Sequence, residues 1–371
     1  MRISNKFRNV AYGLTALLLA SCNHRQPEST TLIRIPIREE AFLLKDTLSN
    51  HLIVDRVVKL ESHRSALMGI ISQVEWADSL IFIRKQDNSA DLLVFSSGGR
   101  FLRNICSKGK GPGEAMEFSG FIIDSDCHLV YLQDWANKLI VKDYYGKLVA
   151  EYKVPYGAST LIKVDADHLG FAAEGQFLVY LTDLAGKEIK HFMPYEPMFQ
   201  FGMSHALINT GKEVLYQRYL DDTLYVLNRD TLVPRYLIDF GDRALTREKF
   251  LEFPANSMGE RKIEGNFMFF PTIFGNSGDQ VALSFAYNRH NYMTFIDLAT
   301  RRSCVFDWSQ IKNDPRIRSY MRLCSSTNPD CFIGYVMPDN LDVENIPPMF
   351  ASAGPIAEDD NPILVFYRFS F

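Results

Sequence analysis

The sequence predicts an all-β fold, a six-bladed β-propeller of four-stranded antiparallel blades, with a short helical insertion around residues 244–262. Three observations lead to this prediction. Aromatic residues make up 13% of the chain, one strand–turn–strand pattern recurs along it, and its turns repeat at a nearly regular interval. Aromatic and β-branched residues favour strands over helices. A chain of 371 residues with 47% hydrophobic residues is long enough to bury a large core.

The repeated pattern is clearest in residues 129–149, where two apolar runs flank a short polar loop and the second run ends in an Asp-x-x-Gly turn. Asp caps its own backbone and Gly tolerates a positive φ, so this pair suits a tight turn between antiparallel strands. Other copies lie at 80–102, 177–187, 223–229 and 292–301. We therefore expect each copy to form part of one blade.

The spacing of the turns matches the length of a blade. The intervals are 46, 40, 45 and 69 residues between the successive turn positions Ser97, Asp143, Asp183, Asn228 and Asp297. Three of the four intervals fit a four-stranded propeller blade. The long last interval contains a charged amphipathic stretch, residues 244–253, which favours a helix inserted between blades.

The two ends of the chain supply the strands that complete the ring. Strand-like segments remain at 31–36, 331–336 and 363–369. Closing the last blade with a strand from the other terminus removes exposed sheet edges, so we expect six blades. Large side chains should fill the space between them. The residues that we expect to be buried there are Tyr131, Val141, Tyr180, Tyr225 and Phe295.

The N-terminus has the organisation of an export signal. Arg2, Lys6 and Arg8 precede an apolar run at 10–20, which is too short to span a membrane as a stable helix. Leu19-Ala20-Ser21-Cys22 then resembles the lipobox of bacterial lipoproteins, in which cleavage precedes a lipidated cysteine. An ordinary signal peptide with a chance cysteine is the alternative. The predicted organisation is a signal peptide at 1–21, a tether at 22–30 that begins with lipidated Cys22, and a propeller at 31–371.

Motifs for cofactors, metals and nucleic acids are absent. The net charge of −4 argues against a nucleic-acid-binding protein, which needs positive charge to neutralise the phosphate backbone. Gly109-Lys110-Gly111-Pro112-Gly113-Glu114 lacks the Lys-Ser/Thr of a phosphate loop, so we interpret it as a turn between blades. Residues 124–128 are interpreted as a polar turn and not a metal site. Cys324 and Cys331 either close a small loop or remain free thiols.

The same Gly-rich segment, followed by the Tyr131…Asp134…Asp143…Gly146-Lys147 pattern, resembles the six-bladed β-propeller lipoproteins of the Bacteroidota type. That family is similar to NHL-repeat and TolB-like propellers. The resemblance covers the mature chain, is strongest over 78–154, and weakens after Asp183. It implies the fold and an envelope location, but no activity. No acidic run follows Cys22, which favours an outer-membrane anchor facing the periplasm, with surface exposure as the alternative.

Propeller topology indicates where a ligand would bind. With strands named A to D from the axis outward, the B–C loops and the D–A connections open on one face, here called the loop face. We expect it to collect residues 84–91, 108–114, 134–137, 174–176, 218–222 and 287–290. Arg, Trp and Tyr anchor many ligands and partners, although such loops are polar in any propeller. The candidate binding residues are Arg84, Lys110, Glu114, Asp134, Trp135, Arg218, Asp221, Arg289 and His290.

Two functions fit these observations. One is a monomeric, membrane-anchored binding or scaffold protein that engages a glycan, a peptide or an envelope partner. The other is a lyase or hydrolase of propeller type that uses Asp134, Arg218, Arg289 and His290. We expect Trp135 to be partly exposed on the loop face. The alternative is that its ring folds back over the blade as a lid.

Overall fold

The structure is a computed structural model. It describes residues 32–42, 47–87, 89–154, 157–173, 175–196, 206–255, 261–309, 322–323, 331–341 and 346–371. The predicted signal peptide, Cys22 and the tether lie outside the described residues, as do Cys324 and Glu174. Residues Leu32–Phe371 form one compact unit.

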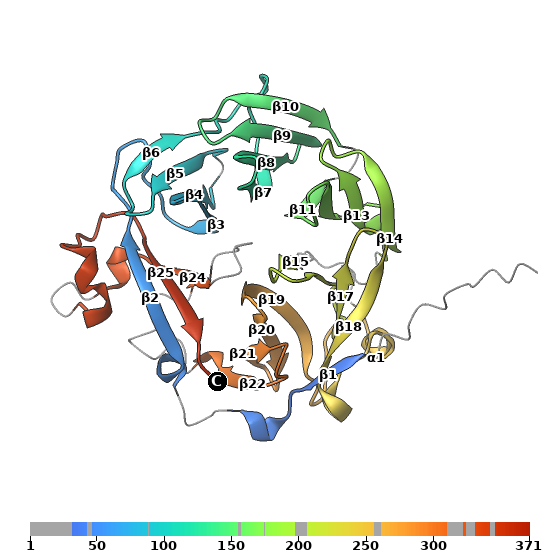
Figure 1. The fold of residues 1–371 in the computed structure, drawn as a ribbon. Helices are drawn as coiled ribbons and strands as arrows, with labels where there is room; N and C mark the ends of the chain where they lie inside the picture. The colour runs from blue at the N-terminus through green and yellow to red at the C-terminus, as the bar shows by residue number, and fades with distance from the viewer. Residues whose placement is uncertain are drawn as a thin grey trace, which may run out of the picture. The chain divides into compact units, whose positions relative to one another are not determined.

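Six antiparallel sheets follow one another around a ring, which confirms the predicted six-bladed β-propeller (Figure 1). In each of the first three blades the strand that comes first in the chain lies nearest the axis and the fourth lies outermost. The strands of these blades are β3 Ile71–Ala77, β4 Leu80–Lys85, β5 Leu92–Ser96 and β6 Phe101–Asn104 in blade 1, β7 Phe118–Asp124, β8 Leu129–Asp134, β9 Lys138–Asp143 and β10 Leu148–Lys153 in blade 2, and β11 Ala158–Lys163, β12 His168–Ala173, β13 Phe177–Asp183 and β14 Glu188–Pro194 in blade 3.

The other three blades involve both ends of the chain. Their strands are β15 Ala206–Asn209, β16 Val214–Gln217, β17 Thr223–Leu227 and β18 Leu232–Asp239 in blade 4, β19 Phe269–Ser277, β20 Gln280–Tyr287, β21 His290–Asp297 and β22 Ser303–Asp307 in blade 5, and β23 Arg322–Leu323, β24 Phe332–Val336, β25 Ile363–Phe369 and β2 Leu52–Lys59 in blade 6. The strand β1 Ile33–Pro36 adds to blade 4 as a fifth strand, parallel to β18.

The ring is closed as predicted by a strand from the other terminus, but the predicted segment was wrong. The closing strand is β2, whose residues pair with β25 from Leu52 to Lys59. The segment predicted for closure, 31–36, instead supplies β1 on the outer edge of blade 4. Only four residues of β1 pair, and the last is Pro36, which has no N–H and is tolerated at a sheet edge.

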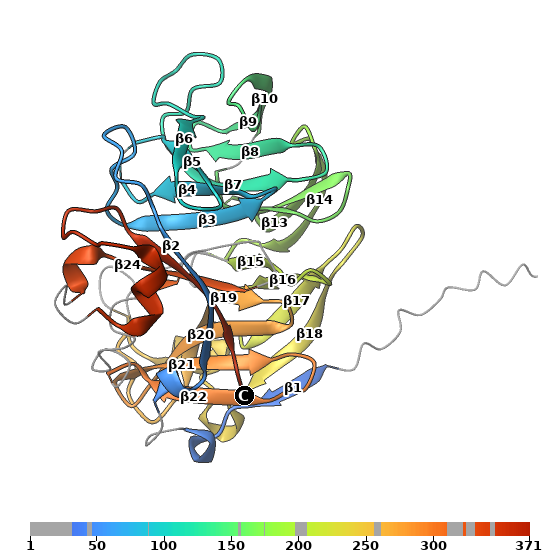
Figure 2. The ribbon, with the colours of Figure 1, turned by 60° about the vertical axis from the view of Figure 1, so that its left-hand side comes forward.

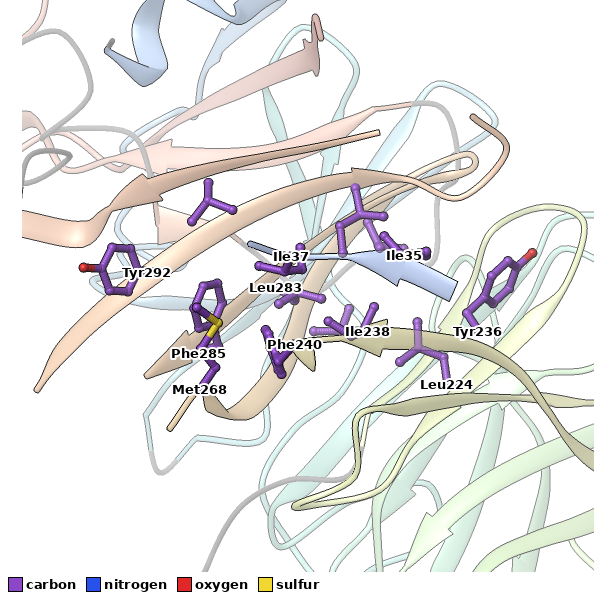
Figure 3. Close-up of a cluster of buried hydrophobic side chains, with 14 of the residues drawn as sticks. Ile35, Ile37, Leu224, Tyr236, Ile238, Phe240, Met268, Leu283, Phe285 and Tyr292 are labelled. Atoms are coloured by element: carbon purple, nitrogen blue, oxygen red, sulfur yellow. The ribbon is translucent and has the colours of Figure 1, made fainter. Parts of the chain in front are cut away.

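The N-terminal residues 32–42 and 47–51, here called the strap, lie along the outer edges of blades 4 and 5 and reach the junction of blades 5 and 6 (Figures 1 and 2). After β1, Phe42 bridges Val305 of β22, and the ring of His51 stacks on Phe369 of β25. The strap also contains the 3-10 helices η1 Glu39–Ala41 and η2 Leu48–Asn50. Figure 3 shows the cluster that joins the strap to two blades, formed by Ile35 and Ile37 with Ile238 and Phe240 of blade 4 and Leu283 and Phe285 of blade 5.

Apolar side chains fill the spaces between blades, and four of the five residues that we expected there are buried. Tyr131, Val141, Tyr180 and Phe295 have at most 6% of their surface exposed. The prediction for Tyr225 was wrong, since its side chain is half-buried. The Tyr225 hydroxyl reaches the loop that follows β16, where it donates a hydrogen bond to Asp221 at 2.9 Å.

Glycines in the C–D turns of blades 1–3 allow neighbouring blades to approach closely. Gly99, Gly146 and Gly186 have φ values of 84°, 89° and 75°, in the left-handed region that favours glycine. A Cβ on Gly99 would lie 2.0 Å from the carbonyl oxygen of Lys59, the last residue of β2 in blade 6. Gly146 and Gly186 face Ile105 and Val154, which directly follow the outer strands of blades 1 and 2.

Buried amides also join the inner strands of adjacent blades. Gln73 of β3 donates to the Phe121 carbonyl at 2.6 Å and accepts from the Phe121 N–H at 3.2 Å. Gln217 of β16 makes the same pair of bonds, to the Pro271 carbonyl and the Ile273 N–H of blade 5. Each glutamine side chain therefore satisfies a backbone N–H and a backbone carbonyl of the neighbouring blade.

The predicted helical insertion is confirmed between blades 4 and 5. The helix α1 Arg247–Glu252 follows the 3-10 helix η4 Gly241–Arg243, and the Thr246 hydroxyl caps it by accepting from the Lys249 N–H. Two further 3-10 helices, η5 Pro338–Asn340 and η6 Pro348–Ala353, lie between β24 and β25. No helix within the described ranges is both long and apolar enough to span a membrane. The thiols of Cys106 and Cys127 are free.

Candidate functional site

The strand order places the predicted loops together on one face. The second and third strands are connected in blades 1, 2, 4 and 5 by residues 86–91, 135–137, 218–222 and 288–289, respectively. Blade 1 is connected to blade 2 by residues 105–117. In an antiparallel blade these connections share one end of the sheet, so they form the loop face.

Trp135 projects from this face on a well-held turn. Its side chain is 58% exposed, so the expectation of partial exposure is confirmed. The Trp135 N–H donates to the Glu117 carbonyl at 2.9 Å, and the Asn137 N–H donates to the Asp134 carbonyl at 3.1 Å. The Asn137 carbonyl in turn accepts from the Val154 N–H at 2.9 Å. The backbone of the turn is therefore fixed from three sides while the ring faces solvent.

Three exposed aliphatic side chains lie in connections of the same face. Leu67 and Ile70, between β2 and β3, are 54% and 45% exposed, and Met116, between β6 and β7, is 37% exposed. Met116 precedes Glu117, the residue that binds the backbone of Trp135. We call Leu67, Ile70, Met116 and Trp135 the blade 1–2 patch. The sequence analysis did not identify its three aliphatic members.

Arg84 lies at the end of β4 in blade 1. Its guanidinium donates to the Ser72 hydroxyl at 3.0 Å and is half-buried. Burial lowers the pKa of Arg84, and the Glu117 and Asp87 carboxylates oppose this shift. Because Glu117 acts on the charge of Arg84, we infer that the Arg84 guanidinium lies near the connection that carries Met116.

Asp134 lies beneath the surface and not on it. The residue is fully buried, and its Oδ1 accepts a hydrogen bond from the Glu117 N–H at 3.2 Å. Its Oδ2 has no hydrogen-bond partner among the described residues. Asp134 thus holds together the two connections that carry Met116 and Trp135.

The Gly-rich segment is a connection between β6 and β7, as interpreted from the sequence. Two carboxylates of the chain occupy its amides: Glu114 accepts from the Gly111 N–H at 2.8 Å, and Glu151 accepts from the Gly113 N–H at 2.9 Å. The Lys138 ammonium donates to the Glu114 carbonyl at 2.9 Å. Lys110 is exposed at the tip. The amides that a phosphate would need are therefore already bonded.

Arg218 and Asp221 form an ion pair within one loop of blade 4. The Asp221 Oδ2 accepts from the Arg218 Nε at 3.1 Å and from its Nη2 at 2.9 Å. Glu196, which follows blade 3, lies 3.8 Å from Arg218 and also pairs with Arg247 of α1. This network fastens α1 over the loop. The Asp221 carboxylate and burial together raise the pKa of Tyr225 to about 12.

Asp222 differs from its neighbour because no hydrogen bond to its carboxylate is found among the described residues. Burial, reinforced by the carboxylates of Asp221 and Asp239, raises the pKa of Asp222 to about 8.

Arg289 and His290 lie on blade 5. Asn288 and Arg289 have φ values of 50° and 65°, so they form the two-residue turn that joins β20 to β21. Both Arg289 and His290 are exposed, and the His290 Nδ1 lies 3.5 Å from the Asp307 Oδ2.

The residues proposed for a lyase or hydrolase do not meet. Within the described residues, no hydrogen bond or ion pair joins Asp134 of blade 2, Arg218 of blade 4 and the adjacent Arg289 and His290 of blade 5. No group of three or more potential metal ligands occurs in that part of the chain. Residues 125–128 form the turn between β7 and β8, and the Asp124 carboxylate before it pairs with the Lys163 ammonium at 2.6 Å.

Comparison with known proteins gives the family and supports the fold. A crystal structure from Bacteroides fragilis, whose name assigns it provisionally to exported proteins, has a TM-score of 0.73 at 18% identity and covers 91% of this chain and 100% of that chain. A member of the DUF4221 family from Bacteroides vulgatus has a TM-score of 0.50 at 10% identity and covers 86% of this chain and 98% of that chain. No match was found among curated proteins. Residues 35–368 match the model of a domain of unknown function, DUF4934, and the chain therefore belongs to the DUF4934 family.

Proposed function

We propose that this protein is a monomeric envelope lipoprotein that binds a protein partner through the blade 1–2 patch. The exposed indole of Trp135, held on a rigid turn, is the observation that carries the proposal. Trp is enriched among the residues that dominate protein-binding energy, and a fixed backbone limits the entropy lost on binding.

The composition of the patch favours a protein over a glycan. Trp135 suits either ligand, because an indole stacks on sugar rings and also fits apolar pockets. Leu67, Ile70 and Met116 offer no hydrogen bonds to sugar hydroxyls, whereas they match apolar side chains of a partner. Exposed apolar side chains on one face of a folded domain commonly mark interaction sites.

The anchor and the location belong to the same proposal. The segment Leu19-Ala20-Ser21-Cys22 supports a lipid on Cys22, and the Bacteroides fragilis protein of similar fold is named as exported. We place the protein at the outer membrane facing the periplasm, in kinship with NHL-repeat and TolB-like propellers. Labelling with a fatty-acid probe tests the anchor. The label should be lost in Cys22→Ala and retained in Cys127→Ala, the matched control at an exposed free cysteine. Undiminished label in Cys22→Ala would overturn the lipid assignment.

Site-specific photo-crosslinking in cells tests the binding surface. A photoreactive residue at position 135 should yield a discrete protein adduct. The same residue at position 145, where Tyr145 is 77% exposed, should not yield it. With the captured partner purified, Trp135→Ala should raise Kd at least about tenfold, as expected for a hot-spot tryptophan. Lys110→Ala, at an exposed cation of a neighbouring connection, should leave Kd within about twofold.

Two results would contradict the choice of partner. Identical adducts from positions 135 and 145 would mean that the patch has no special role. A saturable change of tryptophan fluorescence on titration with envelope glycans, lost in Trp135→Phe, would instead identify the patch as a glycan site.

A further inference from the structure

A recess lies at the seam where the ring closes, between blade 6 and blade 1. It has a volume of about 530 Å³ and is bounded by β2 of blade 6, the C–D turn of blade 1 at residues 97–100, and η6. This volume falls within the usual range for small-molecule sites. We call it the seam cleft.

The walls of the seam cleft are held rigidly together. Because Gly99 has no side chain, the turn of blade 1 packs directly on the Lys59 carbonyl. The Glu61 N–H donates to the Gly99 carbonyl at 2.8 Å, and the Glu61 carboxylate accepts from the Phe101 N–H at 2.8 Å. On the other side, the Lys59 ammonium pairs with Asp360 at 2.6 Å and also donates to the Pro355 carbonyl. A ligand would therefore meet a preformed site.

Positive charge in the cleft is only partly balanced. The lining includes Arg56, Lys59 and Arg100 and a single acid, Glu61. Lys59 and Glu61 are satisfied by the contacts above. In the part of the chain that the structure describes, neither the Arg56 nor the Arg100 guanidinium forms a hydrogen bond or an ion pair. Two arginines in one recess thus lack anionic partners.

Arg56 is held in a specific orientation. Its guanidinium carbon lies 3.7 Å from the centre of the Trp76 ring and 4.5 Å from that of Phe366. Burial lowers the pKa of this half-buried arginine. Aromatic contacts orient a guanidinium while leaving its N–H donors free, and a desolvated cation without a counter-ion favours binding of an anion.

We propose that the seam cleft binds an anionic ligand whose carboxylate or phosphate oxygens accept hydrogen bonds from Arg56 and Arg100. Guanidinium groups match the planar oxygen pair of either anion through paired N–H donors. The seam cleft and the blade 1–2 patch share no residue, so occupancy of the cleft and partner binding can be tested separately.

Thermal unfolding of the mature protein at constant ionic strength tests the proposal, with sodium phosphate and sodium glutarate as the two probes and chloride as reference. A ligand that binds only the folded state raises Tm. At least one probe should raise Tm in the wild type, with Kd increased about tenfold or more in Arg56→Gln and in Arg100→Gln. The probe that acts distinguishes a phosphate ligand from a carboxylate ligand.

Two variants keep the test decisive. Arg100 is exposed, so Arg100→Gln should fold even if loss of the Arg56 ring contacts destabilises Arg56→Gln. Arg289→Gln, at an exposed cation on blade 5, should respond like the wild type. The proposal is overturned if neither probe raises Tm, or if Arg100→Gln and Arg289→Gln respond alike.

Discussion

Blades 1–3 and blades 4–6 are joined to their neighbours by different means. In blades 1–3 a glycine with positive φ brings each C–D turn against the end of the preceding outer strand. The corresponding turns of blades 4 and 5, at residues 228–231 and 297–301, contain no glycine. The strap instead covers the outer edges of blades 4 and 5 and packs at the junction of blades 5 and 6.

This difference explains why the glycine-containing form of the repeat is confined to blades 1–3. Where a turn must carry both a capping acid and a glycine, as at Asp143 and Gly146, the requirement leaves a regular sequence pattern. Where the strap packs against the blades, the C–D turns do not need a glycine. The turn glycine of the repeat therefore indicates how adjacent blades are joined.

The largest expected effect compares one tyrosine from each half. Tyr131→Ala should cost about 3–5 kcal/mol of the free energy of unfolding, because a buried aromatic ring is lost between blades 2 and 3. Tyr225→Ala should cost about 1–2 kcal/mol, since its ring is half-buried and its main polar contact is to Asp221. Urea unfolding measures both values. Tyr145→Ala, at a 77% exposed ring, is the control, and equal losses for Tyr131 and Tyr225 would contradict the distinction.

Weakening the contacts of the strap should destabilise blades 4–6 and leave blades 1–3 unchanged. Ile35 is fully buried in β1, so Ile35→Ala should cost about 2–4 kcal/mol. Hydrogen exchange should become faster in β18 and β22 while β4 and β13 keep their protection. Arg34→Ala, at the largely exposed neighbour, provides the control. Uniform loss of protection around the ring would show that the strap has no special role in blades 4–6.

Substituting a turn glycine should weaken the junction between blade 1 and blade 6. Gly99→Ala should cost about 2–3 kcal/mol, because the new Cβ adopts an unfavourable φ and meets the Lys59 carbonyl. Gly98→Ala in the same turn has its nearest atom at 3.9 Å and should change stability by less than about 0.5 kcal/mol. If Gly99→Ala and Gly98→Ala unfold at the same urea concentration, the glycine of the turn has no packing role.

Local chemistry was predictable from the sequence, whereas long-range pairing was not. The C–D turns and the exposure of Trp135 follow from residues a few positions apart. The assignment of 31–36 to ring closure was wrong because the partner of β2 is β25, at the far end of the chain. The exposure of Leu67 and Ile70 was not predicted. The sequence alone does not distinguish an apolar residue of a connection that faces the core from one that faces solvent. The seam cleft exists only after both termini have met.

The last prediction concerns pH and the strap half. Asp222 has a pKa raised to about 8 in the folded protein, against 3.8 ordinarily. Between these values the folded state holds a proton that the unfolded state has released. Stability should therefore fall as pH rises from about 4 to 8, with a slope of up to about 1.4 kcal/mol per pH unit from this group.

Asp222→Asn removes that titration, so its free energy of unfolding should depend less steeply on pH than that of the wild type between pH 5 and 8. Asp359→Asn, at an exposed acid between β24 and β25, should keep the wild-type slope. Because Asp239 raises the pKa of Asp222 and lies at the end of β18 beside β1, the same pH rise should speed hydrogen exchange in β18 before β4. Parallel pH profiles for the wild type and Asp222→Asn would mean that Asp222 is already ionised in the folded protein at pH 5. The blade 4 loop would then contribute no pH dependence to the half of the ring held by the strap.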